Sequence, residues 1–145
     1  GRFDPAKARQ NGVPLRLWSR LQAGESLEGF HPEDVLGEAR RGLSLLYSTD
    51  TRPVADMVRL GKECDLMVLE GMFGDPEKDE RARVTHHMTM REAAEIARDA
   101  QPARLWLTHF SPATPHPEEY LEEMQTLFPR LQMGECGLKE TLIFA

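Results

Sequence analysis

Short apolar runs alternate with amphipathic stretches over the second part of the chain, and this alternation predicts its fold. The runs of strand length are residues 43–48, 65–69, 104–108 and 140–144. Between them, apolar residues recur at helical spacing, which predicts helices after Pro53, after Thr89 and over residues 118–128. Alternating strands and helices are typical of right-handed βαβ crossovers, so we expect a layered α/β sheet.

The first forty residues predict helices and no strands. Asp4 followed by Pro5 is typical of an N-cap and a first helical residue, and Gly12 is expected to end this short helix. Residues 14–23 have a second helical pattern that Gly24 terminates.

A stretch of mixed charge, GDPEKDERAR at residues 74–83, predicts an exposed loop, with a mobile lid as the alternative. Thr89 and Glu92 follow it with the spacing of a capping box. A helix should therefore begin just after His87, which places that imidazole at the positive end of the helix dipole.

An ionisable residue follows each of the first three predicted strands. Asp50 lies in YSTDTRP, Glu70 in LEGMF and His109 in LTHFSP. Ligands of parallel α/β sheets gather at the carboxyl ends of the strands, so we expect these residues to lie together, joined by His87. Two imidazoles and two carboxylates are ligand chemistry typical of a hydrolytic metal site.

Each of these residues also has a purely structural interpretation. Asp50 could cap the following helix, His109 could be a hydrogen-bonded core histidine, and Glu70 could bond only to a neighbouring loop. His87 could be a surface residue, and His86 competes with it because adjacent residues cannot both face inward from one backbone geometry.

Composition narrows the classes of protein. The net charge is −6, which repels phosphate backbones, so any nucleic-acid role must depend on a local site. No apolar run approaches the roughly 20 residues that cross a bilayer, and we expect one soluble domain over residues 1–145.

Cys64 and Cys136 lack CxxC spacing, which favours a reducing compartment such as the cytoplasm. His31 and His116 are expected in turns.

Seven stretches occur in an order and spacing that together are specific. They are GRFDPAKARQNGVP, LWSRLQAGES, HPEDVLG, YSTDTRP, CDLMVLEGMF, HHMTMREAAEIARDA and RLWLTHFSP. Over nearly its whole length the chain resembles the C-terminal half of the ribonuclease Z family, in the metallo-β-lactamase superfamily. The resemblance implies half of an αββα sandwich with a mixed sheet flanked by helices. It also implies a zinc-dependent endoribonuclease that removes 3′ trailers from tRNA precursors by metal-activated water.

The resemblance assigns roles to the candidate residues. Asp50 matches the aspartate that bridges two zinc ions, and His109 matches a histidine that binds the second ion. His87 and Glu70 take catalytic roles. His87 matches a histidine that steadies the phosphate or the leaving group, and Glu70 matches a glutamate that supports the site.

We also predict that Thr51, Arg52 and Ser111 contact the substrate. At five positions the sequence has a different residue from the family pattern. These departures are Thr49 for glycine, Leu69 for histidine, Met88 for serine, and Ala113 and Thr114 for an arginine and an aromatic residue. Loss of the arginine removes a fork of donors that could bind phosphate.

The family signature His-x-His-x-Asp-His is absent from the sequence. Asp50 and His109 alone cannot complete two zinc spheres that each take about four donors. We therefore expect an N-terminal half to be missing, and this chain alone to bind zinc weakly and cleave nothing. Unpaired strand edges predict a homo-oligomer. The alternatives are another phosphodiesterase or esterase of the same fold, or a non-catalytic structural or regulatory half.

Overall fold

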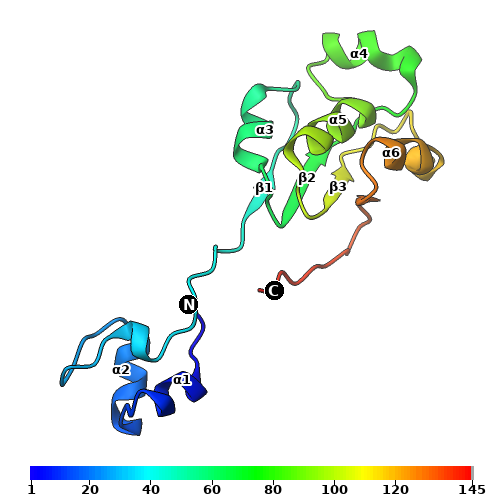
Figure 1. The fold of residues 1–145 in the computed structure, drawn as a ribbon. Helices are drawn as coiled ribbons and strands as arrows, with labels where there is room; N and C mark the ends of the chain where they lie inside the picture. Colours follow the sequence, from blue (N-terminus) through cyan, green and yellow to red (C-terminus); the bar gives the residue numbers. More distant parts are fainter. Residues whose placement is uncertain (145) are drawn as a thin grey trace. The chain divides into compact units, whose positions relative to one another are not determined.

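The computed structural model describes residues 1–144 and divides the chain into two compact units. The first unit is Gly1–Gly42 and the second begins at Leu43. Figure 1 shows short helices in the first unit and a sheet with helices in the second. Each unit packs around a separate core, so the two are described separately.

The first unit confirms the two helices that the sequence predicts there. They are α1 (Pro5–Gln10) and α2 (Trp18–Gln22), with single 3₁₀ turns at η1 (Leu15–Leu17) and η2 (Pro32–Asp34). The Asp4 carboxylate accepts the amides of Ala6 and Lys7, both at 3.0 Å, which caps α1. The Phe3 and Trp18 rings pack 5.1 Å apart against the small core.

The second unit is a four-stranded parallel sheet with the strand order β1-β2-β3-β4. Its strands are β1 (Leu45–Tyr47), β2 (Leu66–Glu70), β3 (Leu105–Thr108) and β4 (Leu131–Met133). The crossovers contain α3 (Ala55–Gly61), α5 (Met90–Ala100) and α6 (Leu121–Leu127), the last preceded by η4 (Pro117–Tyr120). The predicted α/β class is confirmed. The mixed sheet that the resemblance implies is not found among the described residues, whose sheet is parallel throughout.

The predicted fourth strand is wrong. Residues 140–144 form no strand, and the edge strand is β4, directly after α6. In β4, Leu131 and Met133 are buried and Gln132 is exposed. Three residues are too few for this alternation to register as a pattern. The later segment has more apolar residues but leaves Ile143 largely exposed.

The predicted loop at residues 74–83 is also wrong, because most of it is helical. It contains η3 (Pro76–Lys78) and α4 (Asp79–Val84). The Asp75 carboxylate caps the start by accepting the Glu77 amide at 2.9 Å. Ala82 is fully buried while the charged residues face solvent, so the helix has a very narrow apolar face.

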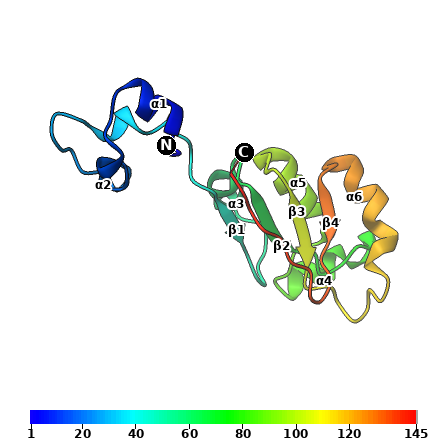
Figure 2. The ribbon, with the colours of Figure 1, turned by 90° about the horizontal axis from the view of Figure 1, so that it is seen from below.

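Helices cover one face of the sheet. In Figures 1 and 2, α3, α5 and α6 lie along the same side of the strands. Fully buried side chains of β2 and β3 pack against the alanine stripe of α5, and they are Met67, Leu69, Leu105 and Leu107. Small residues on α5 allow it to approach the sheet closely.

The other face of the sheet is only partly covered. A cavity of about 590 Å³ lies there, lined by Tyr47, Val68 and Trp106 and by four residues after β4, which are Gly134, Glu135, Cys136 and Leu138. Figure 2 shows the segment after β4 running across the strands, and the ion pair of Arg104 with Glu140 (2.5 Å) fixes part of it. No helix within residues 1–144 has the length and apolarity to span a membrane.

We predict that Leu105→Ala lowers the free energy of unfolding by about 2–5 kcal/mol, because it leaves a void between β3 and the helix layer. Leu60→Ala is the matched control, since Leu60 of α3 is exposed, and it should change stability by less than about 0.5 kcal/mol. Urea unfolding followed by circular dichroism measures both. Equal losses would contradict this assignment of the core.

Candidate metal centre

The carboxyl ends of three neighbouring strands bring the candidate residues to one edge of the sheet. Asp50 lies in the loop between β1 and α3, Glu70 ends β2, and His109 directly follows β3. Glu70 pairs with Thr108 in the parallel register, so the chain delivers His109 beside it. His87 comes from the turn before α5.

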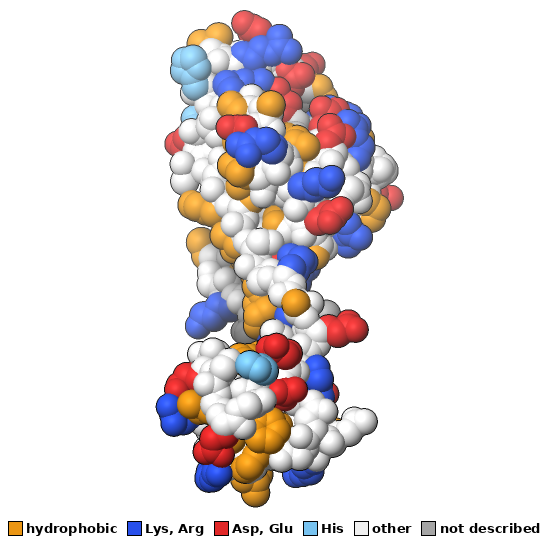
Figure 3. Space-filling model, turned by 60° about the vertical axis from the view of Figure 1, so that its left-hand side comes forward, with side chains coloured by type: hydrophobic (Ala, Val, Ile, Leu, Met, Phe, Trp, Pro, Cys, Tyr) orange, Lys and Arg blue, Asp and Glu red, His pale blue; other side chains and the backbone are white. Residues whose placement is uncertain are grey.

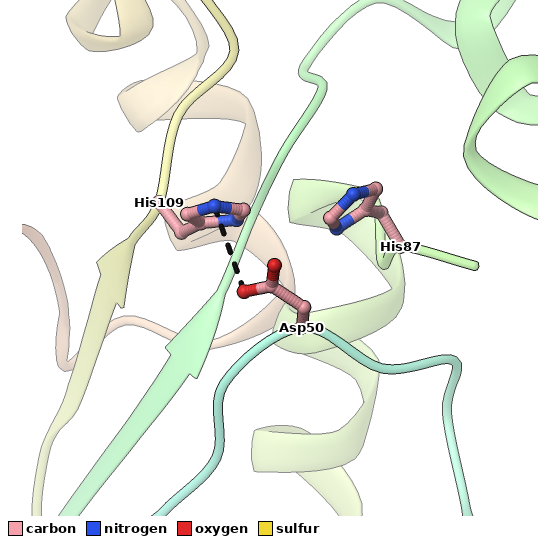
Figure 4. Close-up of side chains that lie close together, drawn as sticks. All are labelled: Asp50, His87 and His109. Atoms are coloured by element: carbon pink, nitrogen blue, oxygen red, sulfur yellow. Dashed lines mark ion pairs between the residues drawn. The ribbon is translucent and has the colours of Figure 1, made fainter. Parts of the chain in front are cut away.

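Asp50, His87 and His109 converge on a common space. Each offers one ligand atom, and these atoms lie within 4.8 Å of one another. His109 Nε2 lies 3.5 Å from Asp50 Oδ1, an ion pair drawn as the dashed line in Figure 4. The side chains of Asp50 and His109 are 57% and 42% exposed, so a ligand can reach them from solvent.

Glu70 holds this arrangement together from inside the protein. Its side chain is fully buried. Oε1 accepts the Thr51 amide at 2.5 Å, while Oε2 lies 2.8 Å from His87 Nδ1 and 3.4 Å from His109 Nδ1. With Nδ1 of each ring directed at Glu70, the Nε2 atoms remain for a metal ion or a substrate.

Two histidines near the site have left-handed backbone conformations. His86 has φ 61° and His109 has φ 57°, which is uncommon for residues with a side chain. The reversal at His86 leaves that residue exposed and turns His87 inward, where its side chain is 15% exposed. Of the two adjacent histidines, His87 is therefore the one that faces the site.

The residues predicted to contact substrate make contacts within the protein. The Thr51 hydroxyl donates to the Arg52 carbonyl at 3.0 Å. Arg52 forms an ion pair with Glu92. Ser111 is buried, and its hydroxyl accepts the Ala113 amide at 3.1 Å. Substrate contact by Thr51, Arg52 and Ser111 stays a prediction.

His31 and His116 are not among the residues that share this space. His31 Nδ1 is 3.0 Å from the Ser26 hydroxyl in the first unit, and His116, which directly precedes η4, has its Nδ1 3.2 Å from the Glu118 carboxylate. Both occupy turn regions, as the sequence predicts.

Glu92 forms the capping box that the sequence predicts and also an ion pair that the sequence does not predict. Its carboxylate accepts the Thr89 amide at 3.0 Å and also pairs with Arg52, forty positions away in the chain. Burial raises the pKa of Glu92, but hydrogen bonds from Arg52 and Thr89 outweigh it, so the pKa lies below the ordinary 4.5. No local pattern could have revealed this pair.

The amino-acid sequence of this chain matches the model of a known family. Residues 3–110 match the model described as "Beta-lactamase superfamily domain". The chain belongs to the β-lactamase superfamily. Within this superfamily, it is 45% identical to Ribonuclease Z of Lachnoclostridium phytofermentans, over 99% of this chain and 49% of that protein. It is 44% identical to Ribonuclease Z of Clostridium acetobutylicum, over 92% of this chain and 44% of that protein. The chain thus spans about half the length of these curated relatives.

Solved structures agree with the superfamily assignment. The short form of human tRNase Z matches with a TM-score of 0.50 and 26% identity, over 65% of this chain and 31% of that one. The metallo-β-lactamase fold protein YhfI from Bacillus subtilis matches with a TM-score of 0.56 and 23% identity, over 64% of this chain and 37% of that one. The second likeness shows the fold alone.

The donor set fits a metal cofactor of the kind that this superfamily suggests. Carboxylate oxygen with imidazole nitrogen is the ligand chemistry of Zn²⁺ and similar divalent ions. Among residues 1–144, Asp50, His87 and His109 are the group of His, Cys, Asp and Glu side chains close enough to share an ion.

We predict that Glu92 makes stability depend on pH. Because its folded pKa is lowered, its contribution is complete above pH 4.5 and is lost as the pH falls through the folded pKa. Thermal melts between pH 3 and pH 7 should therefore show a smaller acid loss of Tm in Glu92→Gln than in the parent. Glu95→Gln on the same helix is the control and should follow the parent. A parallel decline in Glu92→Gln and the parent would contradict this role.

Proposed function

We propose that this chain is part of a zinc-dependent endoribonuclease that removes 3′ trailers from tRNA precursors. The convergence of Asp50, His87 and His109 at the strand ends carries the proposal. It is supported by relatives named Ribonuclease Z that match nearly the whole chain at 36–45% identity.

Asp50 and His109 hold the metal in this proposal. Both are open to solvent, and each directs a donor atom into the shared space. Zinc bound there would supply positive charge and lower the pKa of water toward neutrality. Glu70 orients His109 from the buried side through Nδ1, at 3.4 Å.

His87 acts on the substrate. Its Nδ1 is 2.8 Å from Glu70, which fixes the ring and leaves Nε2 as the nitrogen available to the substrate. From this position His87 can donate a hydrogen bond or a proton to the charge that develops as the phosphodiester bond breaks.

The donor set is too small for two zinc ions. Two ions need about four donors each, whereas residues 1–144 supply three candidates at this edge. We therefore propose that an N-terminal half, with further histidine ligands, completes the site. This chain alone would bind zinc weakly and would not cleave RNA.

The open sheet face is the surface on which such a half would pack. Tyr47 and Leu45 of β1 are mostly exposed there, and the cavity of about 590 Å³ lies beside them. Among the described residues, Trp106 Nε1 is buried without a hydrogen-bond partner. A second layer would cover these apolar groups and could offer an acceptor to the indole.

Two of the departures from the family pattern lie in the core, and these two do not weaken the catalytic interpretation. Met88 and Leu69 are fully buried among the residues that pack the helix layer. Their side chains therefore fill the interior and do not replace groups of the exposed site. This favours the enzyme over a non-catalytic half.

Substrate phosphates must be recognised locally. Figure 3 shows basic and acidic side chains interspersed over the visible face of the larger unit, and the net charge is −6. A field of this kind does not attract RNA over long distances. Another phosphodiester remains the alternative substrate.

We propose a cytoplasmic location for the protein. Both cysteines are free thiols, as a reducing compartment favours. Cys64 is buried in the core, and burial raises the pKa of its thiol, which makes it unreactive.

Alanine variants of the intact protein test these roles. We expect Asp50→Ala and His109→Ala to lose zinc and to lower kcat for a 3′-extended tRNA precursor by more than about 100-fold. His87→Ala should keep its zinc, measured by atomic absorption, and lower kcat by about 10²–10⁴-fold. His31→Ala is the matched control and should leave both unchanged.

The outcomes separate the alternatives. Zinc loss in His87→Ala would make this histidine a third ligand. Indifference of cleavage to Asp50→Ala and His31→Ala alike would refute the endoribonuclease and favour a structural half.

Self-association tests the open face. The isolated chain should elute as a dimer or larger species in size-exclusion chromatography with light scattering at about 100 μM, because the exposed apolar face seeks cover. Tyr47→Lys should shift it toward monomer, whereas Arg59→Lys on the exposed side of α3 should not. A folded monomer of the parent at this concentration would count against the prediction.

A further inference from the structure

Arg52 connects the loop that carries Asp50 with the turn that carries His87. It lies two positions after Asp50 in the loop that follows β1. Its Nη1 donates to the backbone carbonyl of His87, and to Glu92 Oε2 at 2.9 Å. Its Nη2 donates to Glu92 Oε1. The guanidinium therefore grips Glu92 with two donors and the His87 backbone with one of them.

Glu92 is a rigid anchor for this grip. It occupies the first turn of α5, where its carboxylate accepts the Thr89 amide and its own amide donates to the Thr89 hydroxyl at 3.2 Å. A carboxylate fixed at both its side chain and its backbone transmits position from the helix. The loop that carries Asp50 is thereby tied to the start of α5.

The Arg52 contact complements that of Glu70. Glu70 fixes the His87 ring through Nδ1 and the Asp50 loop through the Thr51 amide. Arg52 fixes the backbone of His87 and the same loop. Ring and backbone of His87 are thus each held to the loop that presents Asp50.

We infer that Arg52 is a positioning residue that sets the distance between Asp50 and His87, and that, in contrast to the substrate contact predicted from the sequence, it does not bind substrate phosphate. The inference rests on the proposed function. A phosphate contact would require the guanidinium to leave Glu92, and the side chain is only 27% exposed. A planar fork is needed for the two-donor grip, so lysine cannot replace it.

The two roles differ in kinetics. A positioning residue affects the reacting geometry, so its loss lowers kcat and leaves KM nearly constant. A phosphate contact affects binding, so its loss raises KM and lowers the salt dependence of binding by about one unit. Positioning through Glu92 also makes substitutions at the two positions non-additive.

The experiment uses the intact protein and a 3′-extended tRNA precursor. The variants are Arg52→Met, Arg52→Lys, Glu92→Gln and the double variant Arg52→Met/Glu92→Gln. We expect Arg52→Met to lower kcat by about 10–100-fold with KM within about 3-fold. Arg52→Lys should restore less than about a third of the loss in log kcat, and the double variant should lie within about 3-fold of Arg52→Met.

Arg59→Met is the matched control, because Arg59 is an exposed arginine of α3 paired with Asp56. Its kcat and KM should equal those of the parent within about 2-fold. If Arg52→Met does not fold, the same comparison is made with Arg52→Lys, which keeps the charge and the aliphatic stem.

A rise of KM by 10-fold or more at constant kcat, a flatter salt dependence, or losses that multiply in the double variant would overturn the inference. Hydrogen exchange of the Thr51 amide in this chain tests the positioning role without measuring cleavage, and so separates that role from the proposed function. Arg52→Met should accelerate that exchange by at least about 10-fold, and Arg59→Met should not. An intact parent protein that cleaves no RNA refutes the proposed function alone, whereas unchanged Thr51 exchange refutes the positioning role.

Discussion

A buried carboxylate is the constraint on which the second unit depends. Glu70 is removed from water at the end of β2, and a buried carboxylate is costly unless donors surround it. Those donors are the Thr51 amide and the rings of His87 and His109, from three segments far apart in the chain. Once Glu70 is buried, these contacts replace its hydration, so formation of the site and correct folding of this edge are coupled.

The parallel sheet explains why the site forms at this edge. The pairing of Glu70 with Thr108 aligns the ends of β2 and β3, and α5 begins shortly after His87. The helix layer packs Leu69 and Leu107 completely, which makes the strands a rigid base. The exposed donors therefore rest on the best-packed part of the unit, as a preorganised site requires.

Features encoded locally were predictable from the sequence. The first three strands appear as apolar runs, and Thr89 with Glu92 marks the start of α5 at the observed place. Features that depend on tertiary contacts were not. β4 is recognised only through pairing with β3, and α4 only through burial of Ala82. The gathering of site residues followed from strand topology, but the Arg52–Glu92 pair did not, because no spacing rule links them.

The asymmetry of the second unit connects its stability with its chemistry. One sheet face is sealed by helices, while the other leaves Tyr47 exposed and the Trp106 indole without a partner among the described residues. The same open side adjoins His109, which lines the cavity there. A segment that packed on this face would bury apolar surface and could bring its own ligands to the three donors already in place. One docking event would both cover the apolar face and complete the set of ligands. Ligand binding and assembly of the two layers would therefore be thermodynamically linked.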